Sequence, residues 1–346
     1  MKIFKKLAVL VALVLTCSLG LIACEEPHEH SYDYAFDGNA HWQICTDEGC
    51  EYKGENAAHT FTESNGYSQG AYCKFETCDT CSYVKKTVIV EAVEATNAVV
   101  GGAGVTAVKE SKVDSTDFAI GTPFSQVIAK LNERCANKAQ PATIKTTIAG
   151  SEKMGIALTG NIKLTENITV GYNNNTTTCL HIIGNTVIDL NGFTISQRGA
   201  ECGAAGLSGY ALFILREGAT LTIIDSSATQ TGCINGVMTA IQTNANSTLN
   251  IYGGTIKCAQ PMTAHDADEE NFCVYTVATN GGTVNVYGGT ITTVATRPII
   301  NSTEICEHTD YNFALATYGA GTYNIYGGTI SGTVDSDITS LNDYRN

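Results

Sequence analysis

One arrangement of apolar and polar residues returns in the second half of the chain. Short runs alternate polar with mostly β-branched apolar residues, and the clearest copies are Thr248–Ile256, Thr283–Ile291 and Thr322–Ile330. An alternation with a period of two predicts β-strands, and recurrence every 28 to 39 residues predicts a repeat protein of stacked units. The residues at equivalent places in the five copies are Asn191, Ile224, Tyr252, Tyr287 and Tyr326.

A second apolar strand precedes each copy by about eleven residues, at 180–183, 211–215, 237–241, 273–277 and 313–316. Each repeat therefore has two or three strands and makes one rung, which is one turn of a solenoid. Stacked rungs bury the row of side chains that points inward.

The repeats at Gly155–Val170 and Asp189–Ile195 resemble the first rungs of the pectate-lyase-like superfamily, as found in bacterial surface proteins, and the similarity spans about residues 155–335. The resemblance implies an all-β fold, a right-handed parallel β-helix, which we assign to residues 151–346. Variable rung length and the lack of a Gly-Gly-x-Gly-x-Asp run argue against a calcium-binding nonapeptide solenoid.

Residues 87–150 are expected to form a linker and a short N-terminal helical cap for the solenoid. Thr122 and Pro123 have the residue types of an N-cap and a first helical position. The apolar residues Phe124, Val127 and Ile128, with Leu131, lie on one face of a helix that should run to about residue 136.

The first 24 residues have a basic start, an apolar run from Leu7 to Leu15, and then Leu21-Ile22-Ala23-Cys24. This arrangement resembles the lipobox of bacterial lipoproteins and implies a signal peptide, residues 1–23, followed by lipidation of Cys24. An ordinary secretory signal peptide is the alternative. We expect an extracytoplasmic protein at the cell surface, with the lipid as its only membrane contact because no other run reaches ~18 apolar residues.

Residues 24–86 predict a small Cys/His-rich module that precedes the solenoid. The residues with metal-ligating chemistry fall in two sets, one with Cys78-x-x-Cys81 and Cys73, and one with His41, Cys45, Cys50 and His59. The openings His41-Trp42 and His59-x-Phe61 resemble small Cys/His-rich modules near the N-termini of bacterial surface proteins. Structural zinc is expected because so small a domain needs a staple, and disulfides are the alternative.

The composition fits a globular chain, with 43% hydrophobic and 16% charged residues. The formal net charge of −14 argues against nucleic acid as a partner. No organic cofactor is indicated.

The alternation also predicts a polar and aromatic row on the outside of the solenoid, because the apolar neighbours of these residues point inward. Aromatic rings beside amides suit sugars, which offer a C–H face and hydroxyls. Two alternatives remain: the like residues stack for stability alone, or another segment covers them. The candidate ligand-binding residues are Asn250, Tyr252, Asn285, Tyr287, Asn324 and Tyr326.

Two acidic insertions, at residues 257–271 and 292–312, leave successive rungs at the same corner. Together they could bind Ca²⁺ or do acid–base chemistry, and a solvated acidic edge is the alternative. The candidate calcium ligands are Asp266, Asp268, Glu269, Glu304, Glu307 and Asp310.

Many β-helices cleave polysaccharides, but fold alone does not imply function. The Asn-Thr-Asp, Asp-Asp, Gly-His-Gly and Arg-Ile-Lys signatures of polygalacturonase-like hydrolases are missing here. We expect a non-catalytic protein that binds carbohydrate or mediates adhesion, with a glycan or another ligand on a host or neighbouring cell as partner. The alternatives are a polysaccharide lyase or glycoside hydrolase, and a purely structural spacer.

Overall fold

The computed structural model describes residues 31–94, 98–111, 118–136, 143–170, 179–197, 211–237, 239–258, 273–293 and 311–345. The chain clusters into two compact units. The first consists of Met1–Gly66 and Lys74–Thr87, and the second of Tyr67–Cys73 and Val88–Asn346.

Two small sheets come first along the chain. β1 (Tyr32–Phe36), β2 (Ala40–Cys45) and β3 (Ala57–Ala58) form an antiparallel sheet. β4 (Phe61–Ser68), β5 (Ala71–Cys78) and β6 (Val84–Val90) form the second three-stranded sheet, with β5 in the middle.

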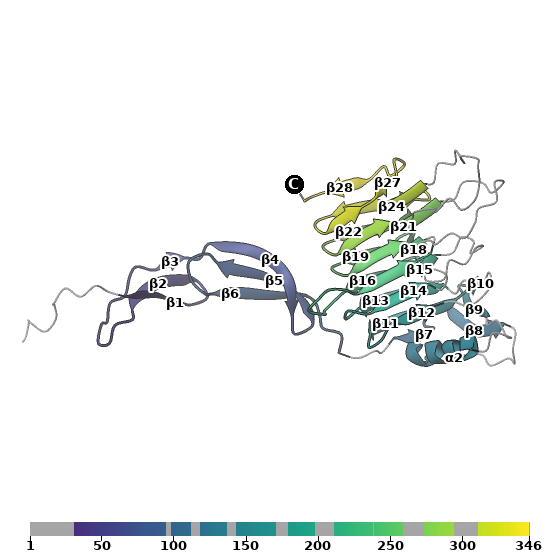
Figure 1. Ribbon diagram of the computed structural model, residues 1–346, viewed down its shortest axis with the longest axis horizontal. Coiled ribbons are helices and arrows are strands. Elements are labelled where there is room, and N and C mark those ends of the chain that lie inside the picture. Colours follow the sequence, from purple (N-terminus) through teal and green to yellow (C-terminus); the bar gives the residue numbers. More distant parts are fainter. Residues whose placement is uncertain are drawn as a thin grey trace, which may run out of the picture. The chain divides into compact units, whose positions relative to one another are not determined.

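The predicted helix is present as α2 (Phe124–Ala136). Phe124, Val127 and Ile128 on its apolar face are buried in the core. Figure 1 shows the helix at the end of the solenoid that begins with β11 (Ile156–Lys163), as expected of a cap. The start differs by one residue, because the Val127 amide bonds to the Pro123 carbonyl and the Thr122 hydroxyl donates to the Ala119 carbonyl. Among the described residues, no helix has the length and apolarity needed to cross a bilayer.

Short strands flank this helix. β7 (Val99–Val100) pairs with the first solenoid strand. β8 (Val105–Ser111), β9 (Thr143–Ile148) and β10 (Ser151–Met154) form an antiparallel sheet.

The rest of the second unit is an all-β parallel solenoid with three faces, as the repeats predict (Figure 1). The first face runs β13-β15-β18-β21-β24-β27, the second β13-β16-β19-β22-β25-β28, and the third β12-β14-β17-β20-β23-β26. β13 serves two faces because its first half pairs with β15 and its second half with β16. The strands are β11 (Ile156–Lys163), β12 (Ile168–Val170), β13 (Leu180–Asp189), β14 (Thr194–Gln197), β15 (Ala211–Leu215), β16 (Thr220–Ile224), β17 (Cys233–Gly236), β18 (Thr239–Asn244), β19 (Thr248–Ile251), β20 (Thr255–Cys258), β21 (Cys273–Asn280), β22 (Thr283–Val286), β23 (Thr290–Thr293), β24 (Tyr311–Thr317), β25 (Thr322–Ile325), β26 (Thr329–Ser331), β27 (Thr333–Val334) and β28 (Leu341–Asp343).

Inward rows of like residues build the core. On the second face Leu221, Leu249, Val284 and Tyr323 stand in register, and all four are buried. Burying one such aliphatic side chain contributes roughly 1.5–3 kcal/mol, so each added rung extends a continuous apolar column.

Candidate functional site

Four side chains of the first unit form a candidate metal centre. His41 lies on β2, His59 just before β4, Cys78 at the end of β5, and Cys81 in the turn that follows. Their ligand atoms all lie within 4.8 Å of one another. The Cys81 Sγ is 3.5 Å from the His59 Nδ1, and the Cys78 Sγ is 3.9 Å from the His41 Nδ1.

Neighbouring groups orient the His59 ring and lower the pKa of the Cys78 thiol, and both effects favour binding of a cation. The His59 Nε2 lies 2.9 Å from the Asp37 carbonyl oxygen, a contact that orients the ring with its Nδ1 toward the Cys81 thiol. Burial raises the pKa of the Cys78 thiol, but hydrogen bonds from His59 and from the backbone amides of Thr80 and Cys81 outweigh it. The net effect lowers the pKa of Cys78 to about 6, so the thiolate is accessible near neutral pH.

The cluster takes two residues from each of the two sets that the sequence suggests. Two thiols and two imidazoles within this distance could hold a metal ion, with all four positions supplied by the protein. Cys45, Cys50 and Cys73 are not among the clustered residues. The spacing of cysteines and histidines along the sequence does not identify these four ligands, because β2 and β5, which carry two of them, are far apart in the chain.

The remaining cysteines of the module have other surroundings. Cys45 lies beside Asp47 and Cys50, and the pKa of its thiol rises to about 11 through burial, with smaller contributions from hydrogen bonds with these two side chains. Cys73 is buried and its thiol points to the Ala71 carbonyl.

The predicted outer row of tyrosines is a stack of nearly parallel rings, the tyrosine ladder. The ring centroids of Tyr252 and Tyr287 are 4.5 Å apart with an interplanar angle of 7°. Tyr287 and Tyr326 follow at 4.9 Å and 6°, and Tyr326 and Tyr344 at 4.9 Å and 9°. Burial, reinforced by Tyr287, raises the pKa of Tyr252 to about 12, which keeps its hydroxyl protonated.

The asparagines form a second stack, the asparagine ladder, through their side-chain amides. Asn285 donates to the Asn250 Oδ1 at 2.9 Å, Asn324 to the Asn285 Oδ1 at 2.9 Å, and Asn342 to the Asn324 Oδ1 at 2.8 Å. Tyr344 and Asn342 extend both ladders beyond the residues that the repeat identified. Their Asn-x-Tyr spacing, the same as in the repeats, is the signal that could have found them.

Both ladders stabilise the rungs that carry them. Because the ring faces stack on one another, the surface presents mainly ring edges and hydroxyls. Tyr326 and Tyr344 are the most open members, with 46% and 56% of their surface exposed. The stabilising role that the sequence leaves open is therefore physically present. Tyr72 also packs on Tyr252, with ring centroids 4.7 Å apart, so another segment contacts this end of the ladder, while Tyr326 and Tyr344 remain exposed.

The other predicted site residues lie outside the residues that the structure describes. These are Cys24 and the calcium candidates Asp266, Asp268, Glu269, Glu304, Glu307 and Asp310.

Asp189 and Asp225 are two fully buried carboxylates of the solenoid, and they accept hydrogen bonds from residues in its turns. Asp189 accepts hydrogen bonds from the amide and hydroxyl of Ser226 and lies 3.4 Å from the Lys163 ammonium. Asp225 accepts from the Gly232 amide at 2.6 Å, among others. Their oxygens hold turns together and have no solvent exposure for acid–base chemistry.

Comparisons of this chain with family models, with curated proteins and with solved structures find no match.

Proposed function

We propose that this protein is a lipid-anchored protein of the bacterial cell surface whose solenoid binds carbohydrate along the tyrosine and asparagine ladders. It is a binding or adhesion protein in this proposal. The observation that carries it is the in-register row of phenol hydroxyls and amides on successive rungs.

The hydrogen-bonding capacity of the ladders supports this role. Each amide has two N–H donors and two acceptor lone pairs, and one ladder bond on each side uses only one of each. The asparagines are only partly buried, so the rest can meet sugar hydroxyls. In the described part of the chain no further ring stacks beyond Tyr344, so this end also offers an aromatic face.

A glycan array with the mature protein tests the site. We expect Tyr326→Ala and Tyr344→Ala to weaken binding by about tenfold or more, as loss of an aromatic contact does. Tyr318→Ala is the matched control, because Tyr318 is 49% exposed but is not in the ladder. Absence of any glycan hit, or an equal loss with Tyr318→Ala, would contradict the proposal.

The lipid anchor rests on the segment Leu21–Cys24 and has its own test. Metabolic labelling with a fatty acid should mark the wild-type protein and sediment it with membranes, whereas Cys24→Ser should be unlabelled. If the Cys24→Ser protein still incorporated the fatty acid, Cys24 would not be the site of lipidation.

The cluster of His41, His59, Cys78 and Cys81 supports zinc in a structural role. Zinc favours four-coordinate sites of thiolate and imidazole, and a site with four protein ligands leaves no open position for a substrate. The metal would act as the staple of a module too small to fold on apolar burial alone.

A further inference from the structure

A cleft of about 740 Å³ opens at another corner of the solenoid. It is lined on one side by Ala103, Gly104 and the β9–β10 hairpin. On the other side it is lined by Ile183 within β13 and by the C-terminal ends of β15, β18 and β21. Along the chain, the cleft residues of each rung come just before the strand of the second face, and the ladder tyrosine comes just after that strand. The cleft and the tyrosine ladder therefore lie at opposite ends of these strands and are separate surfaces.

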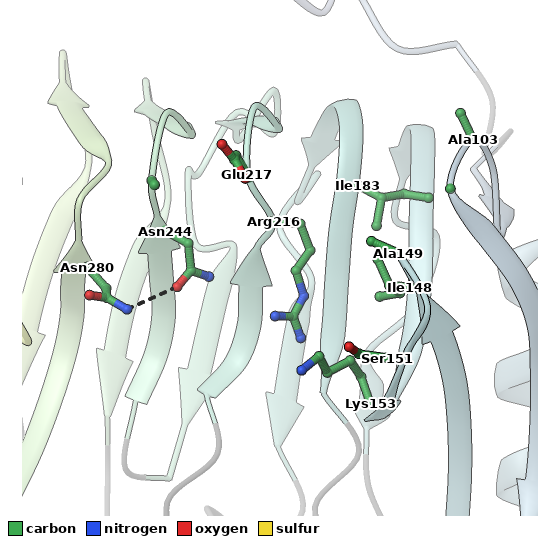
Figure 2. A pocket seen from close by; sticks show the side chains of 12 residues that line it. Ala103, Ile148, Ala149, Ser151, Lys153, Ile183, Arg216, Glu217, Asn244 and Asn280 are labelled. Carbon is green, nitrogen blue, oxygen red and sulfur yellow. Dashed lines mark hydrogen bonds between the residues drawn. The ribbon is translucent and has the colours of Figure 1, made fainter.

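Two cations face this cleft. Figure 2 shows the Lys153 ammonium and the Arg216 guanidinium pointing toward one another. Within the described residues neither makes an ion pair, and the Arg216 Nε is buried without a hydrogen-bond partner. A partly buried charge that no described carboxylate neutralises is costly, and an anionic ligand would lower that cost.

His181 fixes the position of Arg216 without neutralising it. The His181 Nε2 lies 2.7 Å from the Met154 carbonyl and carries the proton, so the Nδ1 accepts a hydrogen bond from the Arg216 Nη2 at 2.9 Å. Burial, and next the Arg216 charge, lower the pKa of His181 to about 3. The imidazole is therefore neutral at physiological pH, and the full positive charge of Arg216 is available to a ligand.

One carboxylate, Glu217, also lines the cleft, but it is exposed and accepts a hydrogen bond from the Asn246 amide at 3.3 Å. It pairs with neither cation. The remaining lining is mixed: Ser151 and Asn280 are exposed polar groups, and Ile148 and Ile183 are apolar.

We propose that this cleft binds an acidic sugar, with its carboxylate or sulfate on Arg216 and Lys153. A guanidinium can bind two oxygens of a carboxylate or a sulfate through two parallel hydrogen bonds, and the Lys153 ammonium adds a point charge. Ser151 and Asn280 can meet hydroxyls, and Ile148 and Ile183 can cover the C–H face of the ring. The proposal is independent of glycan binding at the ladders.

Calorimetric titration of the mature protein tests the site with three probes: a glucuronic-acid disaccharide, its methyl ester, and inorganic sulfate. We expect the acid to bind, and about tenfold weaker binding or none for the ester, because esterification removes the charge. Binding of the acid should also weaken as salt is raised.

The variants Lys153→Gln and Arg216→Gln should each weaken binding of the acid about tenfold or more. Lys257→Gln is the matched control, since it removes the same charge from the third face, and it should change the affinity less than about twofold. Lys153 is half-exposed, so this variant carries the test should Arg216→Gln fail to fold, as a thermal melt would reveal.

Equal affinity for acid and ester, or equal effects of Lys153→Gln and Lys257→Gln, would overturn the proposal. Inorganic sulfate binding as tightly as the disaccharide would overturn the sugar assignment. The cleft proposal is decided by the charge variants Lys153→Gln and Arg216→Gln in this titration, and the ladder proposal by the tyrosine variants on the glycan array, so the two can fail separately.

Discussion

The second glycine of each Tyr-Gly-Gly turn decides how closely the rungs can stack. Gly254, Gly289 and Gly328 have φ values of 77°, 76° and 75°, which favour glycine. A Cβ on Gly289 would also lie 2.6 Å from the Gly254 carbonyl oxygen of the rung below. The second glycine of the turn is thus required both by the local backbone and by the neighbouring rung.

A comparison of two glycine variants separates these requirements. Gly218 has φ +72°, and a Cβ added there would meet no atom within 4 Å, so Gly218→Ala should cost only the conformational strain, about 1 kcal/mol. Gly289→Ala adds the clash and should cost on the order of 3 kcal/mol or more. Urea unfolding measures both, and similar losses would contradict the close approach.

Residue His181 should make stability depend on pH. Its folded pKa, about 3, lies below the ordinary value of about 6.5, so below pH 6.5 the unfolded chain takes up a proton that the folded protein does not. The stability is therefore full above pH 6.5 and is lost as the pH falls toward 3. Arg216 and Lys153, the charged groups that face His181, both act in this direction.

His181→Gln should flatten this dependence, because glutamine keeps a donor and an acceptor but does not titrate in this range. Between pH 7 and pH 5 the wild type should lose about 2 kcal/mol more than the variant, measured by urea unfolding. Parallel pH profiles of the two proteins would show that His181 is not held neutral.

At the scale of strands, the solenoid is stabilised by rows of residues that stand in register on neighbouring rungs. The in-register partners Asn250, Asn285 and Asn324 show that parallel stacking places like residues on one another and lets each amide bond to the next. The alternation in the sequence predicts these rows, and the helix at 124–136 is predicted by its apolar face. The repeat pattern does not predict the end of the ladders, because the residues after Ser331 lack the Gly-Gly turn.

The asparagine ladder predicts a graded effect of substitution. Asn285→Ala removes two ladder bonds and should cost about 1–2 kcal/mol, whereas Asn342→Ala removes one exposed bond at the end and should cost about 0.5 kcal/mol or less. Thermal or urea unfolding of the two variants measures this difference. Equal losses would argue that the amide bonds add nothing beyond strand pairing.

At the scale of the whole molecule, two compact units with different means of stabilisation share one chain. The second unit has the long apolar column of the solenoid. The first has the β1-β2-β3 sheet, most of the β4-β5-β6 sheet and the four-residue cluster, so metal removal should act mainly on this unit.

Trp42, the only tryptophan, lies on β2 of the first unit and reports on that unit. A chelator should shift its fluorescence toward that of an unfolded chain, while the circular dichroism of the solenoid strands persists, because metal binding supplies folding free energy. Cys81→Ser should behave like the chelated protein, and Cys45→Ser, which alters a thiol outside the cluster, should not. Fluorescence unchanged by the chelator would contradict a structural metal.

The solenoid, the cap helix and the rows of like residues follow from the order of residues along the chain. Stacked rungs repeat one local pattern, so the information is present within each stretch of some thirty residues. The membership of the metal cluster and the place of the cationic cleft depend instead on how the chain folds back on itself. His41 meets Cys78, and Lys153 faces the same cleft as Arg216, across long chain separations that no local pattern encodes.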